Sequence, residues 1–318
     1  MIRISRVFSL VALVAVTVVA PVAHAGQTGP ARRVLAADNS TRRLAIVAPD
    51  GTLEWEIKVG AIHDAHLLPN GNILLQQGWT KVQEVTPDQK VVWEYDAGKK
   101  HGNEGKRVEV HAFQRLENGL TMIAESGPAR IIEVDREGNV RHEMKLTVQN
   151  PNAHSDTRLV RKLANGHYLV AHEKDGYVRE YEPSGKVVWE FEVPLFGKPR
   201  KGGHGPDGFG NSVFSAVRLP NGNTLIGAGN GHSVLEVTPG KQIVWKIEQN
   251  DLPGITLAWV TRVERLANGN TIIGNCHAGP TNPQVIEVTA DKKVIWTWKD
   301  FTNFGDSTTV VAVLPKKK

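Results

Sequence analysis

Histidine is the side chain of this sequence best suited to chemistry near neutral pH, because imidazole changes charge in that range. The chain has twelve histidines, and eleven of them lie beyond His24. A neutral imidazole can attack an electrophile and carry a transferred group, while a cationic His or Arg can offset charge on the reacting oxygens. The residues that we select as catalytic candidates are His63, His111, His154 and Arg158.

A second set of polar and aromatic residues is predicted to bind a ligand beside these four. A sugar or an aromatic ligand would suit tryptophans placed next to polar groups. The repeat described below brings this set to the same end of the fold. The predicted ligand-binding residues are Trp79, Glu125, His172, Asn230, His232, Trp259 and His277.

Several of these histidines also have a purely structural interpretation. His63 and His66 are three residues apart, so on a strand they face opposite sides and do not form a chelating pair. We therefore expect His66 to pack or hydrogen-bond between neighbouring sheets. His111 and Arg158 could likewise be channel residues bridged by water.

No metal or cofactor is predicted, because no HxH or HExxH spacing occurs. A divalent metal held by His and Asp or Glu remains a lesser alternative. The single cysteine, Cys276, excludes an internal disulfide, and we expect it to be a small buried residue.

The first 25 residues are predicted to be a secretory signal peptide. Arg3 and Arg6 give a positive start, an apolar run follows, and Ala23–Ala25 has the A-x-A form of a cleavage site. No second run is long enough to span a membrane. We therefore expect a soluble, exported product that is periplasmic or extracellular. Its formal charge would fall from +5 to +3 with the loss of the two arginines, which does not favour a nucleic-acid partner.

One unit recurs along the remainder of the chain and decides the fold. Each copy reads apolar strand, Asn-Gly turn, apolar strand, variable loop, a Val-x-Glu-Val-like strand, polar turn and Val-Val-Trp-Glu. An Asn-Gly pair between apolar runs is a strong hairpin signal. Units of about 40 to 50 residues with four strands are typical of propeller blades. The recurring tryptophans, expected to pack between blades, are Trp55, Trp93, Trp189, Trp245 and Trp296, and His142 takes their place in the third copy.

The two ends of the chain indicate how the ring closes. The first copy has three strands and lacks the inner one, and Thr308–Pro315 supplies it, which removes an exposed edge. We predict an all-β fold: a six-bladed β-propeller of four-stranded blades, closed by the C-terminal strand completing the N-terminal blade. The predicted division is 1–25 signal peptide and 26–318 a single domain, with blades at about 31–59 plus 307–315, 60–97, 108–146, 155–193, 211–248 and 257–298.

Topology then assigns the loops to two faces of the ring. The Asn-Gly turns and the turns before each tryptophan share one face, whereas the longer, variable loops share the other, where function is expected. Counting seven residues back from each Asn-Gly asparagine finds the equivalent position at the axial channel in every copy. These positions are His63, His111, Arg158, Phe214 and Thr261, with Thr309 from the closing strand.

Two resemblances to known families follow from these motifs. Pro183–Trp189 resembles the tryptophan-docking repeat of pyrroloquinoline-quinone (PQQ) propellers, and similar runs occur in most copies. The quinone-contacting vicinal disulfide of those dehydrogenases needs two cysteines, so this resemblance implies the superfamily fold and not a PQQ-dependent dehydrogenase.

His63–Asn72, which reads HDAHLLPNGN, resembles the H-D-x-x-L-L-P-N-G-N segment of bacterial arylsulfotransferases, which are exported six-bladed propellers. The resemblance implies transfer of a sulfuryl group from an aryl sulfate to a phenol through a histidine at the channel mouth. His63 matches the motif itself, and His111, His154 and Arg158 match by type and place. Which histidine would be the nucleophile stays open.

The sequence thus predicts an exported propeller with a His- and Arg-lined pocket on its variable-loop face. The first expectation is a module that binds a small molecule or a protein partner there. An arylsulfotransferase-like group-transfer enzyme is the alternative, and a lyase, lactonase or metal-dependent activity is a further one.

Overall fold

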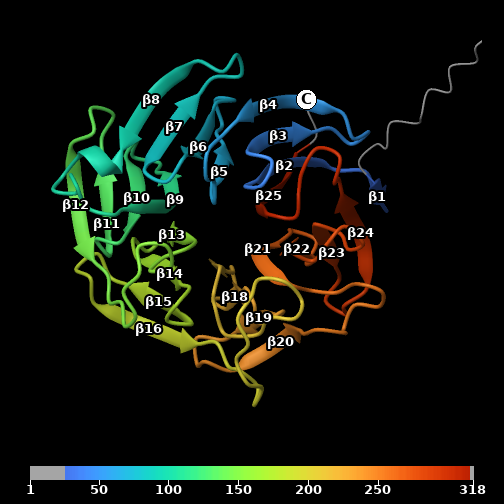
Figure 1. Cartoon of the computed structure of the whole chain (residues 1–318). Coiled ribbons are helices and arrows are strands. Elements are labelled where there is room, and N and C mark those ends of the chain that lie inside the picture. The colour runs from blue at the N-terminus through green and yellow to red at the C-terminus, as the bar shows by residue number, and fades with distance from the viewer. Residues whose placement is uncertain (1–25, 316–318) are drawn as a thin grey trace, which may run out of the picture.

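The alternation of apolar and polar residues in each copy produces a ring of antiparallel sheets around one axis (Figure 1). The structure is a computed structural model and describes residues 26–315. The predicted signal peptide therefore lies outside the described residues. Apart from one short 3-10 turn, Ala97–Lys99, the regular structure of the described part is all strand. The all-β, six-bladed propeller predicted from the sequence is confirmed.

Each blade is a sheet whose strands follow the chain from the axis outward. The split blade, in sheet order, is β25 (Thr308–Leu314), β2 (Arg33–Asp38), β3 (Arg43–Val47) and β4 (Leu53–Lys58). The second and third blades are β5 (Ala65–Leu67), β6 (Ile73–Gln77), β7 (Lys81–Val85) and β8 (Val91–Asp96), then β9 (Glu109–Arg115), β10 (Thr121–Ser126), β11 (Arg130–Val134) and β12 (Val140–Lys145).

The remaining three blades repeat the same order. They are β13 (Val160–Lys162), β14 (Tyr168–His172), β15 (Tyr177–Tyr181) and β16 (Val187–Glu192); β17 (Ser215–Arg218), β18 (Thr224–Gly227), β19 (Val234–Val237) and β20 (Ile243–Ile247); and β21 (Trp259–Arg265), β22 (Thr271–Cys276), β23 (Val285–Val288) and β24 (Val294–Lys299). A fifth strand, β1 (Gly26–Thr28), adds to the outer edge of β24.

The recurring tryptophans join each blade to the next. The indole nitrogens of Trp55, Trp93, Trp189 and Trp245 each donate to a backbone carbonyl in the polar turn of the following blade, at 2.7–3.0 Å. Their expected position between blades is confirmed.

An arginine that belongs to an ion pair lies over the ring of four recurring tryptophans, which are Trp93, Trp189, Trp245 and Trp296. Arg115, on the inner strand of the third blade, lies over the Trp93 ring at 5.2 Å and is 2.9 Å from Glu84 of the second blade. The same arrangement of arginine, tryptophan and Val-x-Glu-Val glutamate recurs around the ring for Arg218, Arg265 and Arg32. The Glu of the repeat is therefore an interblade residue rather than a site residue.

The N-terminal strand completes the tryptophan contact where the ring closes. The Trp296 indole reaches the polar turn of the first blade through the Gln27 side chain, which accepts from the indole at 2.9 Å and donates to the Pro49 carbonyl of that turn at 3.3 Å. Gln27 also bonds the backbone of Arg32, so it ties β24 to the first blade.

A buried carboxylate closes the axial channel beneath the variable-loop face. Asp64, at the start of the second blade, is fully buried and contacts Arg161 at 2.8 and 3.0 Å and Arg262 at 2.6 Å. Arg262 also donates to the His63 carbonyl at 2.9 Å. One carboxylate thus links three inner strands from different blades and fixes the backbone of His63. His66 lies 3.2 Å from Asp64 and 2.9 Å from the Phe113 carbonyl, which is the interblade role expected for it.

Candidate functional site

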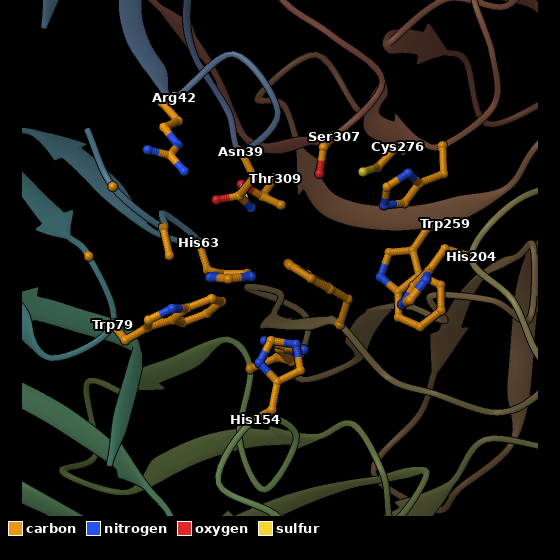
Figure 2. Close-up of a pocket in the computed structure, with 16 residues that line it drawn as sticks. Asn39, Arg42, His63, Trp79, His154, His204, Trp259, Cys276, Ser307 and Thr309 are labelled. Atoms are coloured by element: carbon orange, nitrogen blue, oxygen red, sulfur yellow. Dashed lines mark hydrogen bonds between the residues drawn. The ribbon is translucent and has the colours of Figure 1, made fainter. Parts of the chain in front are cut away.

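A cavity of about 630 Å³ opens at the axis on the variable-loop face (Figure 2). Loops from five blades and the closing strand supply its walls. The lining residues are Asn39, Arg42, Gly60, Ala61, His63, Gly78, Trp79, His154, Arg158, His204, Phe214, Trp259, Cys276, His277, Ser307 and Thr309.

The repeat register explains why these residues meet. His63, Arg158, Phe214 and Thr309 occupy the equivalent position seven residues before each turn, or its counterpart on the closing strand, and all four line the cavity. The loops after the second strands add Asn39, Trp79 and His277, and the last residue of β22 adds Cys276. The short hairpin turns contribute no lining residue within the described part of the chain. The cavity therefore lies on the face formed by the variable loops, as predicted.

His63 lies at the centre of this arrangement, between two aromatic side chains. Its ring centroid is 5.8 Å from that of Trp79 and 6.2 Å from that of Phe214. The residue is 6% exposed. Burial, followed by the nearby His111 and Arg158, lowers the pKa of His63 well below its ordinary value, so the ring is neutral at neutral pH.

A chain of hydrogen bonds behind the cavity orients the His63 ring. Burial and the Arg158 cation lower the pKa of His111 to about 3, so this ring too carries a single N–H. Its Nε2 is 3.3 Å from the Glu109 carboxylate and donates to it. Its Nδ1 then accepts from His63 Nδ1 at 3.3 Å. This assignment of hydrogens leaves a lone pair on His63 Nε2, the ring nitrogen on the far side from His111.

The chain of hydrogen bonds from His63 through His111 ends at the Glu109 carboxylate. Its Oε2 accepts from His154 Nδ1 at 2.7 Å, and its Oε1 accepts from Arg107 at 2.8 Å. Burial raises the pKa of this carboxyl, but the hydrogen bonds from His111, His154 and Arg107 outweigh burial and hold it below its usual range. The carboxylate is therefore ionised and positions both histidines.

Arg158 places a fixed positive charge at the cavity wall. The residue is 4% exposed, and its Nε donates to Glu173. Its guanidinium lies over the Phe214 ring at 5.7 Å and within 3.1 Å of His111 Nδ1. Because the side chain is held from three sides, its charge is preorganised for an anion.

The opposite wall is formed by a second aromatic group. His204 lies beside Trp259 (Figure 2), with ring centroids 4.4 Å apart, and its centroid is 5.3 Å from that of His277. His204 comes from the Gly- and Lys-rich segment between β16 and β17, which reaches back over the axis. Burial and the adjacent His204 lower the pKa of His277.

The charge of the lining is one-sided. It contains two arginines and four histidines, and no Asp or Glu is among the described residues that form it. Of the carboxylates nearby, Glu109 pairs with Arg107 and Glu173 with the lining residue Arg158, while Asp38 and Asp306 accept hydrogen bonds from backbone N–H groups, so cationic and N–H groups predominate at the lining itself. The cavity therefore favours a negatively charged occupant.

Most of the predicted site residues meet in this cavity, and the others lie elsewhere. His63, His154, Arg158, Trp79, Trp259 and His277 line it, and His111 lies directly behind it. Glu125 is buried in an ion pair with Arg130, and His172 is buried between the Asp156 carbonyl and the Tyr181 hydroxyl. Asn230 lines a separate groove, and His232 packs against Phe209.

Three contributors were not selected from the sequence. His204 and Arg42 lie in non-repeating loops, which no register could place. Glu109 could have been found, because it lies two residues before His111 on β9 and so shares its face of the strand.

The buried His172 makes the stability of the fold depend on pH. Burial, then Arg179, lowers its pKa to about 4, while in the unfolded chain it titrates near 6.5. Between pH 6.5 and pH 4 the unfolded state binds a proton at His172 that the folded state does not bind. The free energy of unfolding therefore falls by about 3 kcal/mol as the pH drops through this range. We expect His172→Gln to lose correspondingly less stability over this range in urea unfolding at pH 7 and pH 4. An identical loss in variant and wild type would contradict this assignment.

Within the described residues, no helix is long and apolar enough to cross a membrane.

Comparison with known proteins places the fold. A family model described as outer membrane protein assembly factor BamB (PQQ_2) matches residues 40–297. No curated protein matches the chain. Among solved structures, a protein of unknown function from Bacteroides caccae is 23% identical with a TM-score of 0.73, and the match covers 88% of this chain and 97% of that one.

Two lyases share the same architecture at lower identity. A streptogramin B lyase is 12% identical with a TM-score of 0.58, covering 88% of both chains. Virginiamycin B lyase from Staphylococcus aureus is 10% identical with a TM-score of 0.55, covering 86% of this chain and 87% of that one. At these identities the three likenesses show the fold alone.

Proposed function

The chain belongs to the PQQ_2 family of propellers, whose model is described as outer membrane protein assembly factor BamB, and on that premise we propose that it is an exported protein that binds a small aromatic anion in its axial cavity.

The charge and shape of the cavity carry this proposal. Its volume of about 630 Å³ falls within the range of small-molecule sites, roughly 300–1,000 Å³. Two arginines and four histidines without a lining carboxylate suit an anionic group, and Trp79, Phe214 and Trp259 suit an aromatic ring.

The positions of these groups suggest how the ligand would lie. Arg158 and His154 lie beside His63 at one wall, where an anionic head would accept hydrogen bonds from the Arg158 guanidinium. Trp79 is 44% exposed beside them and offers a ring face to an aromatic body. The ligand would thus be bound by its charge at the wall and by its ring near the mouth.

A small molecule is favoured over a protein partner by where the apolar surface lies. A protein partner would need a large exposed apolar patch on the variable-loop face. Of the exposed large apolar side chains among the described residues, Val91, Val92, Val188 and Val244 lie on outer strands β8, β16 and β20. Phe196, in the loop after β16, lies beside Val244 and Lys246 of β20, and Trp79 is the one that lines the cavity.

Export is supported by the predicted leader and by the outer-membrane role in the family's description. It predicts cleavage between Ala25 and Gly26, which the intact mass of the product in a periplasmic or culture fraction would test. An uncleaved product would contradict it.

A matched pair of ligands tests the binding proposal. 4-Nitrobenzenesulfonate and methyl 4-nitrophenyl sulfone share ring and sulfur and differ in charge. In calorimetric titrations of protein treated with a chelator, we expect saturable one-to-one binding of the sulfonate and at least tenfold weaker binding of the sulfone. Equal affinity for the two, or no binding of the sulfonate, would overturn the proposal.

A second candidate, arylsulfotransferase-like group transfer, is favoured by the neutral His63 ring. Its Nε2 lone pair could attack the sulfur of an aryl sulfate, with the S–O bond breaking and the phenolate leaving; a phenol acceptor would then take the sulfuryl group and regenerate the ring. Phenol-dependent release of 4-nitrophenol from 4-nitrophenyl sulfate, lost in a folded His63→Ala variant, would support it. Absence of release from protein that binds the sulfonate would leave a binding function only.

A further inference from the structure

The cluster of Glu109, His111 and His154 beside the cavity has the composition of a metal site. Glu109 and His111 are two residues apart on β9, so their side chains leave the same face of the strand. His154 reaches them from the loop before β13. One ligand atom from each of the three lies within 4.8 Å of the other two.

The distances are close to those of a bound first-row metal. Ligand atoms about 2.0–2.1 Å from zinc at tetrahedral angles lie roughly 3.3 Å apart. His111 Nε2 is 3.3 Å from Glu109 Oε2, and His154 Nδ1 is 2.7 Å from the same oxygen. Small shifts of His154 would complete the geometry, and its side chain is free to make them because it is 43% exposed.

The surroundings supply the support that a metal site needs. Arg107 holds the other carboxylate oxygen of Glu109, at 2.8 Å, and fixes its orientation. On the opposite side of the His111 ring, Nδ1 lies 3.3 Å from His63 Nδ1 and 3.1 Å from Arg158, so a metal on Nε2 would require the ring proton to move to Nδ1 and be donated to His63, whose own proton then moves to its Nε2. His154 also lines the cavity, so the fourth coordination position would face the ligand.

We propose that Glu109, His111 and His154 bind a divalent zinc-type ion at the wall of the cavity, and that this ion draws the anionic group of the ligand. Two histidines and one carboxylate with an open position are the donor set of zinc and related first-row metals. The carboxylates there, Glu109 and Glu173, are each balanced by an arginine, so the ion would add two uncompensated positive charges. The effect of the ion on ligand binding rests on the proposed function, whereas the metal site itself does not.

Cobalt(II) tests the site directly, because its visible absorption reports four- or five-coordinate binding by nitrogen and oxygen. Protein without a polyhistidine tag, treated with a chelator and dialysed, is titrated with Co²⁺. We expect a saturable one-to-one signal that Zn²⁺ displaces. Glu109→Gln and His154→Gln should each weaken Co²⁺ binding by at least tenfold, whereas His167→Gln, a histidine outside the cluster that pairs with Glu180, should leave it unchanged.

Thermal unfolding of each variant shows whether it is folded before it is titrated. No saturable Co²⁺ signal in folded wild-type protein, or an unchanged signal in either cluster variant, would overturn the metal site. Adding 4-nitrobenzenesulfonate then separates the two proposals. Tighter sulfonate binding with Zn²⁺ present is expected from reciprocal coupling. Sulfonate binding that Zn²⁺ leaves unchanged would overturn the coupling, and sulfonate binding without any Co²⁺ binding would overturn the metal site and leave the proposed function standing.

Discussion

Replacing Asp64 with alanine is expected to lower the free energy of unfolding by about 3–5 kcal/mol, because it would leave two partly buried arginines without their shared counter-ion. Arg161 and Arg262 both point at this carboxylate across the axis, and its side chain is fully buried. Urea unfolding at pH 7 measures the loss directly.

A surface carboxylate in an ion pair provides the matched control. Asp88 pairs with Lys90 in an exposed turn, where water screens the attraction, so Asp88→Ala should cost far less stability than Asp64→Ala. If Asp64→Ala proved no more costly than Asp88→Ala, the axial ion pairs would not hold the inner strands together.

Removing the charge of Arg158 is the second substitution with a large expected effect. We expect Arg158→Met to weaken 4-nitrobenzenesulfonate binding about 100-fold, equivalent to about 2.7 kcal/mol. The guanidinium is buried and held by Glu173, so its attraction for an anion is little screened by water. Isothermal titration calorimetry of the variant measures the change.

Two further variants show whether the effect comes from the charge at this position. Arg158→Lys keeps the charge and should recover part of the affinity, which guards against a loss caused by the unpaired Glu173. Arg136→Met removes a half-exposed cation near Glu84, away from the cavity, and should leave binding unchanged. Similar losses in Arg136→Met and Arg158→Met would mean that general charge attraction, and not the cavity, accounts for binding.

The ring and much of its axial wall could be predicted because both follow from a periodic signal. The Asn-Gly turns fix the register of each inner strand, so a count from each turn found His63, Arg158 and Phe214 at equivalent places. The closing strand β25 was also predicted from the repeat. The first copy of the repeat lacks its inner strand, and the C-terminal segment has the sequence of that strand.

What could not be predicted depends on contacts between segments that share no register. His204 enters the cavity from a loop whose path is set by packing against Trp259 and not by a repeat. Glu125 and His172 lie at the ends of second strands β10 and β14, close to where the lining loops begin, yet Arg130 and Tyr181 contact them within their own blades. Position along the repeat thus indicated which loops reach the axis, whereas the partner of each side chain decided whether it faced the cavity.

The central claim, that this cavity binds an aromatic anion, is tested most directly by a crystal structure of the protein with 4-nitrobenzenesulfonate, which cannot transfer its sulfur group. The account predicts the sulfonate within hydrogen-bonding distance of the Arg158 guanidinium and the ring against Trp79. A ligand bound on another surface, or an empty cavity at saturating ligand, would contradict it.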